Sequence, residues 1–166
     1  GKLSEKATNQ ILELTKNSIL VGFSAMSKDI DEYLPLINKI REKQKIPVML
    51  GGIHSTALPK ESLKIADIIC VGEGEEPLRQ VYEAVKNGNS NYDFPNIGYR
   101  KGDKIVINRT TYFADSLDAL PFPDYKFNDS YLFLKEKDEI EKIPQDPDQR
   151  QKMLKTDTLI FYSQRG

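Results

Sequence analysis

The sequence is poor in the residues that build disulfides and metal sites. Its 166 residues include one cysteine, Cys70, one histidine, His54, and no tryptophan. A single thiol cannot form an internal disulfide, and a lone cysteine is more typical of a reducing compartment than of secretion, so we expect a cytoplasmic protein. One histidine is also too few for a zinc or di-metal site built on a histidine cluster, and we expect no metal site made by the chain's own residues.

Long hydrophobic runs and a surplus of charge of one sign are missing as well. No apolar run approaches the roughly 20 residues that a membrane-spanning helix needs, and residues 1–6 lack the apolar stretch of a signal peptide. The 24 Lys and Arg residues against 25 Asp and Glu residues give a net charge of -1. Such a balance provides no field that would attract nucleic acid or a membrane surface, so we expect neither as a partner.

What the sequence does contain is an alternation of strand and helix patterns over residues 1–88. Short unbroken apolar runs predict strands at 19–23, 46–50 and 68–71, and helical spacing of apolar residues predicts helices at 3–14, 29–44, 59–64 and 75–86. This alternation is typical of a parallel sheet with right-handed crossovers. We therefore predict an α/β domain, an open parallel sheet of the flavodoxin-like or Rossmann-like kind with helices on both faces.

The pattern changes in the turn-rich run at 87–91, and two further regions follow. Residues 89–134 predict a β-hairpin, with strands at 97–100 and 104–107, and then an extended, proline-rich strap at 117–125. Residues 135–166 are expected to be a charged linker, as loop or helix with partial disorder, and the start of a further domain, because a new strand pattern begins at Thr158. Since three strong strands are few for a parallel sheet, we expect strands to be missing upstream and a longer parent protein.

Ligands of open parallel sheets bind beyond the carboxyl ends of the strands, so the residues after each predicted strand are the candidates for a site. Here these residues are mostly small, hydroxyl-bearing or glycine, which would make a shallow shelf that a large ligand can approach closely. The candidate cofactor-binding residues are Ser24, Met26, Ser27, Gly51, Gly52, Ile53, His54, Gly72, Glu73, Gly74 and Glu75.

Several of these motifs have a purely structural interpretation that stays open at this point. The glycine pair Gly51 and Gly52 is also expected where a strand simply ends in a turn, and Ser24 and Ser27 are also expected as helix caps. A lone histidine after such a turn is usually a hydrogen-bonded loop residue.

The acidic motif after the third strand and the cysteine have structural interpretations too. Glu73 and Glu75 suit the start of a helix, where the macrodipole favours negative charge. The motif is not a dinucleotide fingerprint, because Pro77 replaces the third glycine and acidic side chains stand where a pyrophosphate would lie. Cys70 lies in the middle of an apolar strand, which is typical of a small buried hydrophobe rather than a nucleophile, so we expect no catalytic residue.

Four segments of the chain together resemble a known family. Residues 19–27, 47–59, 66–76 and 117–125 are similar, in that order, to the cobalamin-binding domain of cobalamin-dependent radical S-adenosylmethionine enzymes. The most specific of them are Gly-Gly-x-His-x-Thr-Ala-Leu-Pro from Gly51 and Gly-Glu-Gly-Glu-Glu from Gly72, and the resemblance covers about residues 3–127. In that family a strand closing in Ser-x-Arg-Gly comes just before the three-cysteine motif of an iron-sulfur cluster, and Ser163 begins such a sequence here.

The resemblance implies a corrinoid lying across the carboxyl edge of the sheet, with its dimethylbenzimidazole tail beside the strands. It places Ser24 and Gly51-Gly52 at the positions of a Ser-x-Leu and a Gly-Gly motif that line the tail, with Met26 in place of leucine. The Asp-x-His-x-x-Gly motif that supplies an axial histidine in methionine-synthase-like domains is absent, as is the Cys-x-x-x-Cys-x-x-Cys motif. The chain would therefore bind cobalamin without catalysing a reaction itself, and its parent would carry a [4Fe-4S] cluster and S-adenosylmethionine as a methyltransferase or cyclase.

Two other classes of function remain as alternatives. One is a non-catalytic α/β regulatory or interaction module that has lost its ligand. The other is a flavin or nucleotide binder, against which the acidic segment 72–76 argues. Added hydroxocobalamin would separate these classes from the cobalamin-binding domain, because only a cobalamin-binding domain is expected to retain it.

The sequence also predicts that the chain associates with itself. Flavodoxin-like sheets have the strand order 2-1-3-4-5, numbered along the chain, so loss of strands 1 and 2 leaves the strand at 19–23 at a sheet edge. The apolar run of this strand lacks the lysines, prolines or bulges that protect natural edges. We expect a dimer or larger species with its contact near residues 18–24, measured by light scattering. A mass of one chain at high concentration, with slow hydrogen exchange in that strand, would contradict the prediction.

Overall fold

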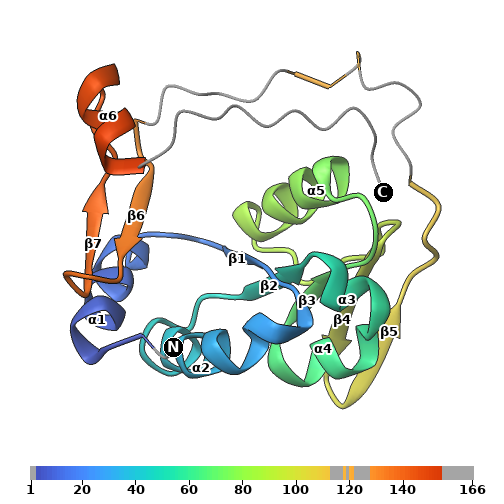
Figure 1. Ribbon diagram of the computed structural model, residues 1–166. Helices are drawn as coiled ribbons and strands as arrows, with labels where there is room; N and C mark the ends of the chain where they lie inside the picture. Colours follow the sequence, from blue (N-terminus) through green and yellow to red (C-terminus); the bar gives the residue numbers. More distant parts are fainter. Residues whose placement is uncertain (1–2, 113–117, 119, 122–127, 155–166) are drawn as a thin grey trace. The chain divides into compact units, whose positions relative to one another are not determined.

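The computed structural model describes residues 3–112, 118, 120–121 and 128–154 (Figure 1). The chain divides into two compact units, residues 1–120 and 121–166, which are described separately below. The candidate residues named from the sequence all lie in the first unit.

The first unit alternates helices and strands before it ends in a hairpin. Its elements are α1 (Glu5–Thr15), β1 (Val21–Ser24), the 3-10 helix η1 (Ser27–Asp29), α2 (Ile30–Gln44), β2 (Val48–Gly51), α3 (Ile53–Ala57), α4 (Pro59–Ile65), β3 (Ile68–Cys70), α5 (Glu75–Lys86), β4 (Ile97–Lys101) and β5 (Lys104–Ile107). In this unit, every helix and strand predicted from the sequence is present, and most of their ends are shifted by one or two residues. One element is new, because α3 forms within the stretch after β2 that was read as a shelf of loop residues.

The five strands form one sheet in the order β1-β2-β3-β4-β5. The first three are parallel, and β4 and β5 continue the sheet as antiparallel strands. The α/β fold predicted from the sequence is confirmed, with the addition that the hairpin belongs to the same sheet. Its inner strand, β4, begins with the buried residues Ile97, Gly98 and Tyr99, which pair with β3, and this buried start explains why the hairpin joins the core.

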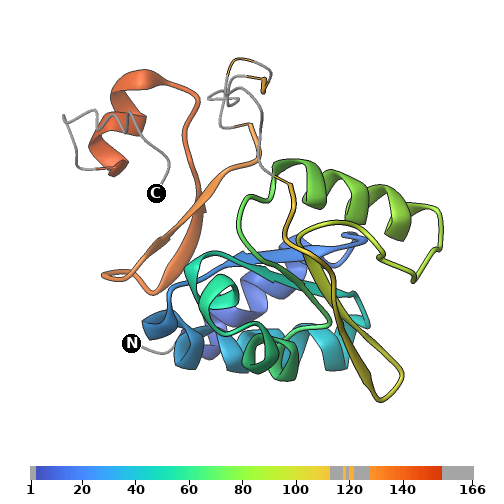
Figure 2. The same ribbon diagram turned by 90° about the vertical axis from the view of Figure 1, so that its right-hand side faces the viewer.

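Helices cover both faces of the sheet, as the unbroken apolar strands predicted. On one face, Val48, Leu50 and Ile69 pack against residues of α1, α2 and α4. On the other face, Met49, Ile68 and Cys70 pack against Val81 of α5 and against Tyr99. Figure 2 shows α5 on the opposite side of the sheet from α2 and α4. Adjacent residues of a strand point to opposite faces, so three short strands supply two cores.

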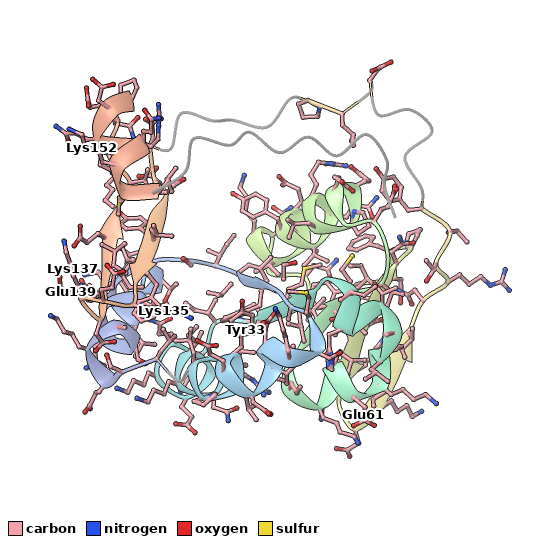
Figure 3. The ribbon with its side chains drawn as sticks, in the orientation of Figure 1. Tyr33, Glu61, Lys135, Lys137, Glu139 and Lys152 are labelled. Atoms are coloured by element: carbon pink, nitrogen blue, oxygen red, sulfur yellow. The ribbon has the colours of Figure 1, made fainter. Side chains whose placement is uncertain are left out.

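Packing of α2 against the sheet includes an aromatic contact. The rings of Phe23 on β1 and Tyr33 on α2 are 5.5 Å apart between centroids and tilted by 45°, a favourable geometry for aromatic pairs. Tyr33 is labelled in Figure 3. Directly before β3, Asp67 accepts a hydrogen bond from the Val48 backbone and forms an ion pair with Arg41 at 2.8 Å. These contacts hold β2 and β3 to α2 at the amino ends of the strands.

The strand register aligns the carboxyl ends of the three parallel strands. Ser24 lies opposite Gly51, and the pairing of Leu50 with Ile69 puts Gly51 beside Cys70. Since β4 runs in the opposite direction, its first residue, Ile97, lies opposite Cys70. Residues that precede β4 therefore lie at the same edge as residues that follow β1, β2 and β3.

The second unit differs from the expectation of a charged linker. It contains a two-stranded antiparallel sheet of β6 (Tyr131–Leu134) and β7 (Glu139–Lys142), followed by α6 (Pro147–Leu154). The charged residues Lys135, Lys137 and Glu139 lie around the tip of this hairpin (Figure 3), so their polarity marks an exposed turn. Most of the predicted strap at 117–125 and the whole predicted strand from Thr158 lie outside the described residues.

β1 is the first strand of the sheet and pairs with β2 alone in the described part of the chain. This agrees with the edge position predicted for residues 19–23. Among the described residues, no helix combines the length and the hydropathy needed to span a membrane.

We expect the two strand glycines Gly98 and Gly22 to respond in opposite ways to alanine. A Cβ at Gly98 would lie 2.9 Å from Cγ1 of the buried Ile69 and 3.3 Å from the Val106 oxygen. Gly98→Ala should therefore lower the free energy of unfolding by about 1–3 kcal/mol, as overpacking does. Gly22→Ala is the matched control, because a Cβ at Gly22 meets nothing within 4 Å. Urea unfolding measures both, and equal stability of the two variants would contradict the packing described.

Candidate functional site

Loops from three neighbouring strands meet at the carboxyl edge of the sheet. The loop after β1 starts at Ala25, the loop after β2 starts at Gly52 and leads into α3, and the loop after β3 leads through Gly72 to α5. Hydrogen bonds between backbone and side chains tie each loop to the next. The candidate residues predicted from the sequence are therefore brought together along one edge.

The first two loops approach each other most closely at Gly52. This residue has φ +90°, and a Cβ on it would lie 2.8 Å from the Ala25 oxygen and 2.9 Å from the Ala25 nitrogen. The Ala25 backbone donates to the Gly51 oxygen and accepts from the His54 backbone, both at 3.1 Å. Gly52 is thus required by the packing of two loops, and the structural interpretation of this glycine holds.

Gly51 is different, because the fold places no such demand on it. Its φ lies outside the left-handed region, and a Cβ there would meet its nearest neighbours, in Cys70 and Phe23, at 3.8 Å. That distance is an ordinary van der Waals contact. A small side chain would fit at position 51 in the chain by itself.

The imidazole of His54 has one satisfied and one unsatisfied nitrogen. Its Nδ1 lies 3.0 Å from the Ser27 hydroxyl, which joins α3 to the loop after β1. The side chain is 7% exposed, and its Nε2 is buried without a hydrogen-bond partner in the described part of the structure. A buried polar atom left unpaired costs about 1–3 kcal/mol, so this nitrogen marks a place where a further polar group would be favourable.

The structure does not support the interpretation of Ser24 and Ser27 as helix caps. The residue that performs this role is Asp29, whose carboxylate accepts from the Met26 backbone at 3.0 Å, while α2 has no side-chain cap. Ser24 is exposed at the end of β1, and Ser27 is directed to His54. Both hydroxyls therefore belong to the edge rather than to the helix start.

Two side chains outside the predicted set hold the third loop. The Thr56 hydroxyl donates to the Gly52 oxygen at 3.1 Å and accepts from the Gly72 backbone at 3.0 Å, so it bridges the loops after β2 and β3. Asn96, directly before β4, donates to the Glu73 oxygen at 3.2 Å. Asn96 was missed because only the antiparallel pairing of β4 brings it to this edge.

Cys70 behaves as the sequence predicted, as a buried residue of the core. Burial raises the pKa of its thiol to about 11, with a smaller contribution from the negative charge of Glu75. The sulfur lies 3.5 Å from the Glu73 oxygen, to which the thiol donates. A thiol held protonated in this way is a poor nucleophile.

The acidic residues after β3 begin α5, as their structural interpretation proposed. The helix starts at Glu75, and Glu75 and Glu76 occupy its first turn. Glu76 forms an ion pair with Arg79 on the following turn, and hydrogen bonds from that guanidinium lower the pKa of the Glu76 carboxyl. Within the described residues there is no group of three or more His, Cys, Asp and Glu side chains placed to hold a metal ion.

Apolar side chains are exposed beside these polar groups. Met26 is 49% exposed after β1, and Ile53 is 62% exposed at the start of α3. The edge thus combines open apolar surface, glycine backbone and hydroxyl groups. Such a surface suits a large ligand with both apolar and hydrogen-bonding parts.

The family comparison covers all of these loops. Residues 6–82 match the model of the B12-binding domain family. This part of the chain is therefore similar to B12-binding domains. All of the predicted site residues lie within this match, and Asn96 lies after its end.

Two solved structures of one enzyme show a similar fold. The radical S-adenosylmethionine methyltransferase TsrM from Kitasatospora setae, with tryptophan substrate and a SAM analog bound, matches 63% of the chain at 19% identity with a TM-score of 0.55. The structure of the same enzyme with cobalamin and a [4Fe-4S] cluster bound matches 61% of the chain at 20% identity, also with a TM-score of 0.55. The matched part is 22% of the length of TsrM in both. A search of curated proteins gave no significant match.

We expect Cys70 to resist alkylation. With a pKa of about 11, roughly one thiol in a thousand is ionised at pH 8, against about a quarter for an exposed cysteine. Iodoacetamide at pH 8 should therefore modify the native chain more than about a hundred times slower than the urea-unfolded chain, as followed by mass spectrometry. The rate should rise with pH up to about 11. Comparable rates for native and unfolded chain would show that the thiol is neither buried nor raised in pKa.

Proposed function

We propose that the chain binds cobalamin across the carboxyl edge of β1, β2 and β3. The observation that carries this proposal is that residues 6–82 match the B12-binding domain family and that the loops at the carboxyl edge carry the residues predicted from the sequence. The named contact residues are our inference from the geometry of the edge. They are Ser24, Met26, Ser27, Gly51, Gly52, Ile53, His54, Gly72, Glu73, Gly74 and Glu75.

The residues present fit a broad, amide-fringed cofactor. Gly51 needs no glycine for the fold, so the absence of a side chain there leaves room for a ligand against the strand end. Met26 and Ile53 expose apolar surface that a corrin or benzimidazole ring would cover, which is favourable by about 25 cal/mol per Å² of apolar area. Neutral hydroxyl and backbone groups beside them match amide side chains better than a phosphate.

His54 supplies a second test of the fit. Its Nε2 is an orphaned polar atom at this edge, and Ser27 holds the ring through Nδ1. If the Ser27 hydroxyl donates to Nδ1, Nε2 carries the proton and can donate to a carbonyl oxygen of the cofactor. Such a hydrogen bond would remove the cost of the unpaired nitrogen.

The chain's own part in the chemistry is to bind and orient. Ser24 and the backbone at Gly51 and Gly72 would hold the cofactor's polar fringe, while Met26 and Ile53 would exclude water from its apolar surface. Bound cobalamin would supply a cobalt that can carry a methyl group or electrons. The cross-loop hydrogen bonds keep these groups at fixed positions, so little ordering would be needed on binding.

We further propose the setting of this domain. The fold match to TsrM, a radical S-adenosylmethionine methyltransferase, supports a parent enzyme that also contains a [4Fe-4S] cluster and uses S-adenosylmethionine. That parent would be a methyltransferase or cyclase of the cytoplasm, and its radical SAM domain would be the main protein partner. For this chain alone we propose self-association through β1, because β1 pairs with β2 only among the residues that the structure describes.

We expect Ile53→Ser to weaken cobalamin binding without unfolding the chain. The side chain is 62% exposed, so its loss costs little stability, but a ligand that covers it would lose about tenfold in affinity. Ile105→Ser is the matched control, because Ile105 is 45% exposed on β5, the last strand of the sheet. Equilibrium dialysis with hydroxocobalamin measures the dissociation constants. Failure of the folded wild-type chain to retain cobalamin would refute the proposed function, and equal effects of the two substitutions would refute the proposed location.

A further inference from the structure

Asn96 is a buried polar residue at the cobalamin-binding edge, outside the B12-binding family match. Its exposed fraction is 0%, and its backbone has φ +63°, a left-handed conformation that asparagine adopts more readily than most residues. The Asn96 oxygen accepts from the Val71 backbone at 2.8 Å, and its nitrogen donates to the Arg109 oxygen at 3.1 Å. The residue therefore joins the end of β3 to the segment after β5.

The side-chain amide of Asn96 uses its full hydrogen-bonding capacity. Its Nδ2 donates to the Glu73 oxygen at 3.2 Å and to the Tyr112 oxygen at 3.0 Å. Its Oδ1 accepts from the backbones of Thr111 and Tyr112, both at 3.0 Å. An asparagine has two donor hydrogens and two acceptor lone pairs, and each of them is matched here. Aspartate keeps the acceptors but loses both donors.

The loop 72–74 depends on this amide for its position. Gly72 has φ +81° and lies between two anchors, since its nitrogen donates to the Thr56 hydroxyl and a Cβ on it would lie 3.6 Å from the Asn96 Nδ2. The next carbonyl, that of Glu73, receives the Asn96 amide and the Cys70 thiol. Thr56 thus holds the loop from the side of α3, and Asn96 holds it from the side of β4.

We propose that Asn96 is a positioning residue for cobalamin binding, which fixes the loop 72–74 and couples it to residues 109–112. This inference rests on the proposed function. Asn96 itself would not contact the cofactor. It acts through Glu73 and Gly72, whose backbone groups form the third part of the edge. A displacement of Thr111 and Tyr112 is transmitted to that loop through one rigid, buried amide.

Asn96→Asp tests the donor role in the full 166-residue chain. The carboxylate faces the Glu73 and Tyr112 oxygens without a proton to share, so the loop should move away from its binding position. We expect the dissociation constant for hydroxocobalamin to rise at least about fivefold at a temperature where circular dichroism shows a folded chain. Asn108→Asp is the matched control, because the Asn108 Nδ2 also donates to two backbone oxygens, those of Tyr92 and Phe94, both at 2.8 Å and neither in the loops that follow β1, β2 and β3. That control should change the dissociation constant by less than about twofold.

Hydrogen exchange of the Gly72 amide provides a readout that needs no ligand. We expect it to be at least about fivefold faster in Asn96→Asp than in Asn108→Asp, because the loop loses one of its two anchors. Equal binding and equal exchange in the two variants would overturn the inference. If the wild-type chain bound no cobalamin, the proposed function would fail, and the exchange result alone would decide whether Asn96 positions the loop.

A second variant covers the case in which Asn96→Asp does not fold. Asn96→Gly keeps the left-handed backbone at no steric cost and removes all four side-chain hydrogen bonds. We expect this variant to fold, with the same weakened binding and faster Gly72 exchange. If neither variant folded, Asn96 would be a residue of the fold alone, and the positioning role would be refuted.

Discussion

The chain after β1 and the chain after β2 meet at Gly52 with no space for a single additional carbon atom. This close approach lets the Ala25 backbone exchange hydrogen bonds with Gly51 and His54, and it places the start of α3 directly at the edge of the sheet. The rest of the edge follows from it, because α3 then carries His54 to Ser27 on one side and Thr56 to Gly72 on the other. A short helix held in this way connects the loops of three strands.

The mixed sheet determines which further residues reach this edge. The parallel strands β1, β2 and β3 end at this edge, whereas the antiparallel strand β4 begins there. The residue that precedes β4, Asn96, therefore also lies at the edge. Asn96 is consequently placed opposite Val71, where its amide can serve both the loop after β3 and the segment after β5. The hairpin that follows the family match is therefore part of the same sheet and contributes to its edge.

The chemical character of the edge is consistent with a carrier of a large cofactor. Its thiol is buried and held protonated, its acidic side chains begin α5, and its exposed groups are glycine backbone, hydroxyls and apolar side chains. This set of groups suits binding and orienting a ligand.

Local patterns in the sequence determined α1, α2, α4 and α5, the three parallel strands and the edge at which the candidate residues lie, because apolar periodicity and strand ends are properties of neighbouring residues. Only the tertiary structure decided that β4 joins the same sheet, that Gly52 rather than Gly51 is required by the fold, and that Ser27 contacts His54 instead of capping a helix. The hairpin of β6 and β7 was likewise missed, since its charged turn resembles a linker. Each of these features depends on a contact between residues distant in sequence, as with the 23 positions between Glu73 and Asn96, and local patterns do not record such contacts.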